Sequence, residues 1–221
     1  MKILNFVILL LLVVVTSRAQ SPADWVNPVI GSSNYGTTNP GAVVPNGMVS
    51  VTPFNVTGSP LNKFDKDAQW WSTPFSSDNR FCTGFTHVNL SGVGCPDLGV
   101  VLLMPTTGKV EAEVEKYGSV IRDQKAVPGY YKGVFEKYNI QAEVTATERV
   151  GLSRFRFPAG QSNVLINLGV GLTNESGAMV RVVNNQEIEG FRMTGNFCYN
   201  QSYERPVYFV ARLNKPAAQF G

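Results

Sequence analysis

The single histidine of the chain lies in a glycine-rich polar stretch, TGFTHVNLSGVGCPDLG, at residues 83–99. His87 is followed by Asn89, Ser91 and Asp97, which bring an amide, a hydroxyl and a carboxylate close to the imidazole in sequence. Glycines let the backbone turn sharply and approach a ligand. We therefore predict a binding loop with these four residues as its candidate contacts. The alternative is a structural histidine that donates to a backbone carbonyl.

Other kinds of catalytic centre fit the sequence poorly. A nucleophilic cysteine beside His87 would need a third group to orient the imidazole, and the sequence offers none. One histidine and no CxxC motif exclude the usual zinc sites. A calcium loop beginning at Asp65 would need glycine at its sixth position and glutamate at its twelfth, where the chain has Trp70 and Ser76.

The carboxylates do not suggest an acid/base pair either. Glycoside hydrolysis needs two acids held apart by about 5 Å for retention or about 6.5–9.5 Å for inversion. The glutamates mostly occupy alternating, strand-like positions that favour solvent exposure. We predict no catalytic residue and no metal ligand in this chain. The glutamates in question are Glu111, Glu113, Glu115, Glu143, Glu148, Glu187 and Glu189.

A long aromatic and polar segment leads into residues 87–97, which we call the histidine loop, and includes them. Residues 54–99 show little regular patterning, and ordered loops of this length are usually functional. Trp70 and Trp71 are adjacent in it, and their rings could stack on sugar C–H faces or pack inside the protein. We retain both tryptophans as candidate sugar contacts.

The first twenty residues differ from the rest. MKILNFVILLLLVVVTSRAQ has a basic start, a short apolar run and small residues after it, which predicts a cleaved secretory signal over residues 1–20. Its removal takes away Lys2 and Arg18, so the net charge falls from +3 to 3 − 2 = +1. A near-neutral chain without basic runs does not fit nucleic-acid binding, and no membrane association is expected after cleavage. We expect a secreted or periplasmic protein.

Residues 21–221 read as an all-β domain. Short apolar runs separated by Pro, Gly and Asn turns are typical of an antiparallel β-sandwich. The alternation of glutamate with apolar residues over 110–120 favours a strand over a helical turn. The expected strands are Met48–Pro53, Val100–Met104, Ile140–Ala146, Leu152–Phe157, Val164–Leu168, Val180–Val183, Gly190–Thr194 and Val207–Leu213.

The cysteine count is odd. Cys82, Cys95 and Cys198 leave at least one thiol free, although export permits a disulfide. Cys82 and Cys95 are nearest in sequence, but spacing alone does not establish which two are paired.

Several ordered blocks resemble glycoside hydrolase family 92, the calcium-dependent exo-α-mannosidases. WVNPVIGSSNYGTTNPGAVVPNGMVSVTP is similar to the N-terminal opening of that family, and GFTHVNLSGVGCPDLGVVLLMPTTG to a later block. PGYY at 128–131 and AEVTATERVGLSRFRFP at 142–158 follow in the family's order. The resemblance covers about residues 24–221. This chain departs from many relatives in having no histidine at 32–39 and in having Val88-Asn89 where Thr-His is common.

The resemblance implies an inverting enzyme made of an N-terminal β-sandwich and a larger (α/α)6 barrel, which supplies the general acid and base. The barrel is missing here, so we expect the sandwich domain alone, inactive by itself, with the calcium ligands outside this chain. It also implies that His87, Asn89, Ser91 and Asp97, with Trp70 and Trp71 before them, wall one side of a mannose pocket. The expected partners are mannose-containing glycans and the missing barrel.

Two other functions remain open. The chain could be a stand-alone carbohydrate-binding β-sandwich without catalysis. It could instead be a purely structural surface module, which full burial of Trp70, Trp71 and His87 would favour.

Overall fold

A computed structural model describes most of the chain after the predicted signal. The expectations for Trp70 and Trp71 fall outside the described part. The described residues are 21–34, 36–62, 72–92, 94–173, 176–195, 197–200, 202 and 204–221, with the side chain of Tyr199 excepted.

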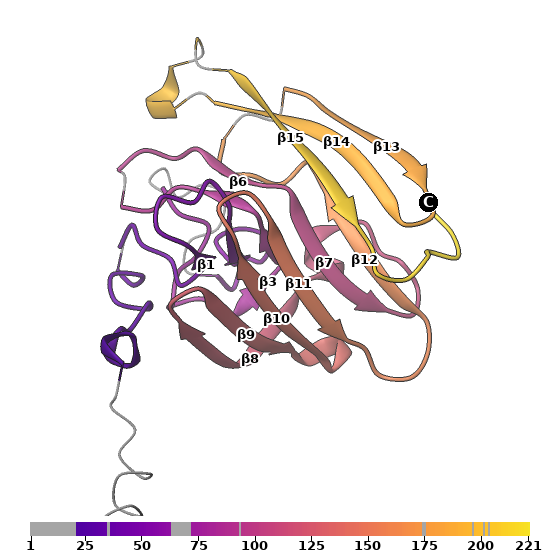
Figure 1. Cartoon of the computed structure of the whole chain (residues 1–221), viewed down its shortest axis with the longest axis horizontal. Coiled ribbons are helices and arrows are strands. Elements are labelled where there is room, and N and C mark those ends of the chain that lie inside the picture. The colour runs from indigo at the N-terminus through magenta and orange to yellow at the C-terminus, as the bar shows by residue number, and fades with distance from the viewer. Residues whose placement is uncertain are drawn as a thin grey trace, which may run out of the picture.

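The first of two five-stranded antiparallel sheets carries the apolar runs on either side of the histidine loop (Figure 1). Its strand order is β1-β2-β4-β7-β12. Strand β2 is short but fully buried, and its polar Ser50 and Thr52 are buried together with Val51 and Phe54. The strands are β1 (Ala42–Val43), β2 (Ser50–Phe54), β4 (Gly84–Thr86), β7 (Leu102–Thr107) and β12 (Ser162–Asn167).

The second five-stranded sheet packs face to face with the first. Its strand order is β11-β10-β9-β8-β3. Strand β10 shows the period-two pattern of a half-buried strand, because Ile140, Ala142 and Val144 face inward while Gln141 and Glu143 face outward. The strands are β3 (Phe81–Cys82), β8 (Ser119–Val127), β9 (Tyr130–Phe135), β10 (Ile140–Ala146) and β11 (Gly151–Arg156).

The core lies between these two sheets and centres on Phe85. Its ring centroid lies 5.9 Å from that of Tyr131, 5.7 Å from that of Phe135 and 6.5 Å from that of Phe155. Aromatic pairs at such distances add to the stabilisation that comes from burial. Phe85 immediately precedes the histidine loop, so the core fixes where that loop begins.

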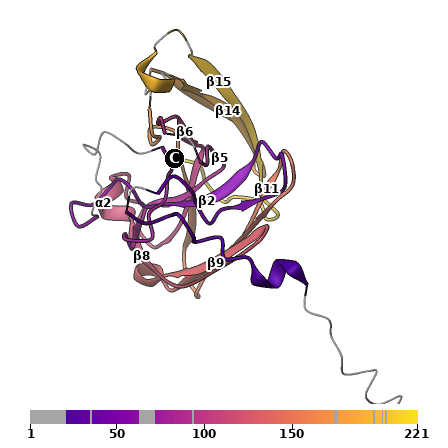
Figure 2. The ribbon, with the colours of Figure 1, turned by 90° about the vertical axis from the view of Figure 1, so that its left-hand side faces the viewer.

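A third sheet lies beyond the first and is made by the last strands (Figure 2). It joins β13 (Ala178–Asn184), β14 (Glu187–Thr194) and β15 (Arg205–Arg212). A two-stranded ribbon pairs β5 (Val88–Asn89) with β6 (Leu98–Val100). The short helical turns are η1 (Pro22–Trp25), α2 (Val114–Tyr117), η2 (Glu136–Tyr138) and η3 (Phe197–Tyr199).

The all-β sandwich is confirmed, and the expected strands occur with shifts of a few residues. Strands β8 and β9 were missed, as were the short strands β1, β3, β4, β5 and β6. In β8, Ile121 and Ala126 both face inward although five positions separate them, because a bulge at Arg122–Lys125, with Asp123 at φ +53°, shifts the register. Strict alternation therefore fails there.

The preference for a strand over 110–120 was wrong. The structure has the helical turn α2 instead, and this turn buries Tyr117. The Tyr117 hydroxyl accepts a hydrogen bond of 2.8 Å from Nδ2 of Asn167 at the end of β12. This tertiary contact decides the local conformation in a way that the alternating pattern could not reveal.

Candidate functional site

The histidine loop sits between β4 and β6 and bridges the two main sheets. The backbone of His87 donates to Val100 O at 3.0 Å and accepts from Ser50 N at 3.0 Å. Its ring atom Nδ1 lies 2.8 Å from Val101 O. Val101 has φ +58°, an uncommon conformation for a β-branched residue. The loop is therefore held by a strained backbone that meets the imidazole.

The surroundings of His87 favour the neutral ring. The side chain is half-buried, and desolvation lowers its pKa below the ordinary value of 6.5, although the backbone contact with Val101 opposes this. A neutral imidazole must donate from Nδ1 to bond a carbonyl oxygen, which leaves Nε2 as the acceptor. The hydrogen bond to Val101 is the one predicted for a structural histidine, and the sugar-contact role of His87 stays a prediction.

The amide of Asn89 is engaged inside the protein. Its Nδ2 donates to Ser50 O at 2.7 Å and lies 3.2 Å from Ser50 Oγ and 3.3 Å from Thr86 O. Its Oδ1 accepts from the Thr86 hydroxyl at 2.8 Å. These bonds tie β5 to β2 and β4. The position of Asn89 is thus fixed, and its contact with a sugar remains untested.

Asp97 joins the histidine loop to the third sheet. Its Oδ1 accepts from the Leu98 amide at 2.7 Å, the Thr194 hydroxyl at 2.7 Å and the Gly195 amide at 3.0 Å. It also lies 3.1 Å from Oγ1 of Thr173, whose hydroxyl donates to Gly195 O at 2.6 Å. A carboxylate that accepts several such bonds is firmly held in place. Asp97 therefore anchors one end of the loop.

Ser91 is the exposed member of the predicted set. The neighbouring backbone is fixed, since the Gly92 amide donates to Thr37 O at 2.7 Å and Leu90 O accepts from Nδ2 of Asn39 at 3.2 Å. The structure thus carries His87, Asn89, Ser91 and Asp97 on one loop. The side chains of Asn89 and Asp97 each make several hydrogen bonds within the protein, whereas Ser91 faces solvent.

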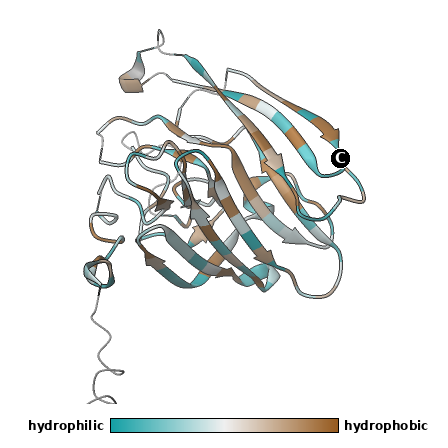
Figure 3. Cartoon of the chain, in the orientation of Figure 1, coloured by the Kyte–Doolittle hydropathy of each residue, from teal (hydrophilic) through white to brown (hydrophobic). Residues whose placement is uncertain are grey.

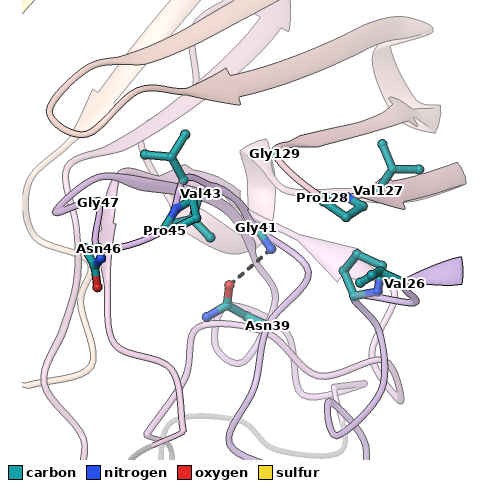
Figure 4. Close-up of a pocket in the computed structure, with 12 residues that line it drawn as sticks. Val26, Asn39, Gly41, Val43, Pro45, Asn46, Gly47, Val127, Pro128 and Gly129 are labelled. Atoms are coloured by element: carbon teal, nitrogen blue, oxygen red, sulfur yellow. Dashed lines mark hydrogen bonds between the residues drawn. The ribbon is translucent and has the colours of Figure 1, made fainter. Parts of the chain in front are cut away.

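A groove of about 500 Å³ opens next to this loop (Figure 4). Asn39 connects the two, because its Nδ2 binds the loop at Leu90 while its Oδ1 accepts from the Gly41 amide at 3.1 Å and the Thr52 hydroxyl at 3.0 Å. Apolar walls with a few polar groups are typical of small-molecule sites. The lining residues are Val26, Pro28, Asn39, Gly41, Val43, Val44, Pro45, Asn46, Gly47 and the turn Val127–Gly129.

Two features of this region were missed by sequence reasoning. The disulfide joins Cys95 to Cys198, 103 positions apart, and leaves Cys82 buried and free. Arg192 is 1% exposed and donates to the carbonyl oxygens of Leu168, Met193 and Thr173 at 2.7, 2.8 and 3.3 Å. The alternation along β14 would have placed Arg192 on the inward face with Ile188, but no sequence signal reveals the disulfide partner.

The described residues supply little acid/base chemistry. Hydrogen bonds from Tyr130 and Arg154 lower the pKa of Glu143, which is opposite to the raised pKa of a general acid. Within the described ranges, no three His, Cys, Asp or Glu side chains come together as a metal site.

Comparison with known proteins identifies the family. Residues 25–221 match the model of the glycosyl hydrolase family 92 N-terminal domain. The chain belongs to glycoside hydrolase family 92. A family 92 α-mannosidase from Bacteroides thetaiotaomicron, solved in complex with mannoimidazole, is similar to this family 92 domain over 88% of the chain, with 28% identity and a TM-score of 0.75. An inverting family 92 mannosidase from the same organism shares the fold, with 21% identity over 87% of the chain and a TM-score of 0.63.

This family 92 domain spans only part of its relatives. It covers about a quarter of each of those two structures. An uncharacterized secreted glycosidase from Arthroderma benhamiae is 30% identical over 169 residues, which are 70% of this chain and 20% of the relative. In the described part of the family 92 domain, no helix is long and apolar enough to cross a bilayer.

Proposed function

We propose that this chain is the N-terminal domain of a secreted or periplasmic inverting α-mannosidase that removes terminal mannose from glycans. The match to the family 92 N-terminal domain over residues 25–221 carries the proposal. The similarity to an α-mannosidase solved with mannoimidazole supports the substrate class. The groove is a second candidate surface of this domain: none of its lining residues belongs to the loop that carries His87, Asn89, Ser91 and Asp97, and Asn39 links the two.

The proposed reaction is a single displacement. A carboxylic acid protonates the glycosidic oxygen while a carboxylate activates water on the opposite face of the ring. Both groups, and any calcium ligands, are assigned to polypeptide outside this chain. The contribution of this domain is positional: its core and the Asp97 contacts hold the loop that carries Ser91.

The activity can be tested with a chromogenic α-mannoside. We expect no hydrolysis by residues 21–221 alone and clear hydrolysis by a longer polypeptide that includes the natural continuation. Proton NMR of the first product should show β-mannose, as inversion requires. Hydrolysis by the isolated domain would contradict the assignment of the acid and base to other polypeptide, and α-mannose as the first product would contradict inversion.

The second candidate is a stand-alone carbohydrate-binding module, which the groove by itself could support. A calorimetric titration of methyl α-mannoside into residues 21–221 separates the two functions. If a second domain completes the pocket, the isolated domain should bind the mannoside weakly or not at all. A dissociation constant of about 1 mM or lower, near −4 kcal/mol of binding free energy, would favour the binding module.

A further inference from the structure

The outer face of the second sheet carries a row of charges that crosses four strands. Strand pairing places Lys125 of β8 opposite Lys132 of β9, Lys132 opposite Glu143 of β10, and Glu143 opposite Arg154 of β11. Neighbouring strands lie about 4.8 Å apart, so these side chains form a single line across the sheet. Both lysines and Arg154 are exposed. Figure 1 shows β8 to β11 side by side, and Figure 3 shows hydrophilic residues along them.

The opposed side chains of Lys125 and Lys132 lower the stability of the sheet. Like charges directly opposite on adjacent strands destabilise a sheet. Within the described part of the chain, neither Lys125 nor Lys132 has an ion-pair partner. The nearby carboxylate of Glu143 is bound by Arg154 at 2.7 Å and lies 3.8 Å from Arg156. It also accepts a hydrogen bond of 2.7 Å from the Tyr130 hydroxyl. Glu143, the one carboxylate in the row, is thus already paired with Arg154. Repulsion between Lys125 and Lys132 would be relieved by an anion bound over both.

Two further rows flank the charged row. On one side, strand pairing sets Arg122, Val134, Gln141 and Arg156 in line, and Arg122 pairs with Asp123. On the other side lie Val127, Tyr130, Thr145 and Leu152, of which Leu152 is 65% exposed. The surface therefore combines two rows that carry cations with an adjacent aromatic and aliphatic strip. We call it the basic face, defined by Arg122, Lys125, Lys132, Arg154 and Arg156 together with the strip formed by Val127, Tyr130 and Leu152.

Positive charge is concentrated on the basic face. After removal of residues 1–20 the chain has 19 − 2 = 17 basic and 16 acidic residues, a net charge of +1. The basic face has five cations, and its two acids, Asp123 and Glu143, bring its net charge to 5 − 2 = +3. The remainder of the mature chain thus has a net charge of −2. Such an asymmetry directs anionic partners to one surface.

We infer that the basic face binds an anionic polysaccharide, one that carries carboxylate, sulfate or phosphate groups. A linear polymer lying along the rows would place its anionic groups over Lys125 and Lys132 and its sugar C–H faces over Tyr130 and Leu152. Aromatic rings and aliphatic side chains suit such apolar faces, and the cations suit the charges. A chain with a net charge of +1 after removal of residues 1–20 and without basic runs does not fit nucleic-acid binding. The inference goes beyond the proposed hydrolysis and does not depend on it.

The test compares matched polymers and matched variants of residues 21–221 at 150 mM salt. Dextran sulfate and neutral dextran serve as probes, with biolayer interferometry as the measurement. We expect binding to dextran sulfate alone, weakened tenfold or more by Lys125→Gln with Lys132→Gln. The slope of log affinity against log salt should become shallower by about two, one unit for each lost ionic contact.

Lys109→Gln with Lys116→Gln is the control, since it removes the same charge from exposed lysines off the basic face. It should leave the affinity nearly unchanged. The face variant should also unfold at a urea concentration equal to or above that of wild type, because it removes the opposed lysines. Absence of dextran sulfate binding, or equal losses in both variants, would overturn the inference. Tighter binding to phosphatidylglycerol vesicles than to dextran sulfate would replace the polysaccharide with a membrane surface.

Discussion

The imidazole of His87 packs directly against the backbone of Gly151 in β11. A Cβ atom at position 151 would lie 2.7 Å from Cδ2 of the ring and 2.7 Å from Cγ2 of Val51. Glycine is required there because a side chain would force the ring or the strand to move. This contact with β11, together with the bond from the Ser50 amide of β2 to His87 O, ties the histidine loop to both main sheets.

We expect Gly151→Ala to destabilise the domain by about 1–3 kcal/mol, the usual cost of overpacking. His87→Ala in the same background should recover part of that loss, because it removes one of the two clashing atoms. Urea unfolding of the double-mutant cycle measures the coupling. Gly94→Ala is the control, since a Cβ there would meet nothing within 4 Å. Fully additive effects of the two substitutions would show that His87 and Gly151 are not in contact.

The domain should lose stability as the pH falls below about 6.5. Burial lowers the pKa of His87 in the folded state, so the unfolded chain binds a proton that the folded chain does not. The loss starts near the ordinary histidine pKa and can reach about 1.4 kcal/mol for each pH unit. Because His87 is the single histidine, His87→Gln should flatten the stability profile between pH 7.5 and 5.5, as measured by urea unfolding. An unchanged slope in the variant would contradict this cause.

Removing the Asp97 carboxylate should loosen the third sheet from the histidine loop. Asp97→Ala leaves the amides of Leu98 and Gly195 and the hydroxyl of Thr194 without their shared acceptor, and we expect a loss of about 2–4 kcal/mol. Asp97→Asn keeps an oxygen acceptor and should cost less. Asp123→Asn, which breaks only an exposed ion pair, should change the unfolding free energy by less than about 0.5 kcal/mol. Equal effects of Asp97→Ala and Asp123→Asn would refute the anchoring role.

The Cys95–Cys198 disulfide should contribute strongly to stability. It closes a loop across 103 positions, for which loop-closure entropy gives about 4–5 kcal/mol. The double variant Cys95→Ser with Cys198→Ser should therefore unfold at a much lower urea concentration than wild type. Cys82→Ala, which removes a thiol outside the disulfide, serves as the comparison. A double variant as stable as wild type would mean that the two cysteines are not linked.

The third thiol should be unreactive until the protein unfolds. Burial raises the pKa of Cys82 to about 12, so almost no thiolate is present near neutral pH. With iodoacetamide at pH 8, mass spectrometry should find no alkylation of the folded chain, one modification in guanidinium, and three after reduction. Modification of the folded chain would place Cys82 at the surface.

Several features could be predicted from local sequence. Alternating apolar residues in segments such as Ile140–Ala146 predicted the strands, because one face of each must be buried and successive side chains point to opposite faces. The glycine and polar pattern around His87 located the loop, and the ordered blocks gave the family. The short apolar run of residues 1–20 remains the basis for predicting a secretory signal.

Other features depended on long-range contacts. The bulge at Asp123 conceals β8, and the pairing of Lys125 with Lys132 exists only because that bulge shifts the register by one residue. Cys95 meets Cys198, and Asp97 meets Thr194, because β14 returns beside the loop about a hundred residues later. Spacing along the chain cannot encode such meetings, since they require the packing of whole sheets. The sequence alone determined the β-rich class, most of the long strands and the family, because these depend on local patterns and ordered blocks. The tertiary structure decided which polar groups form hydrogen bonds inside the protein and which face solvent.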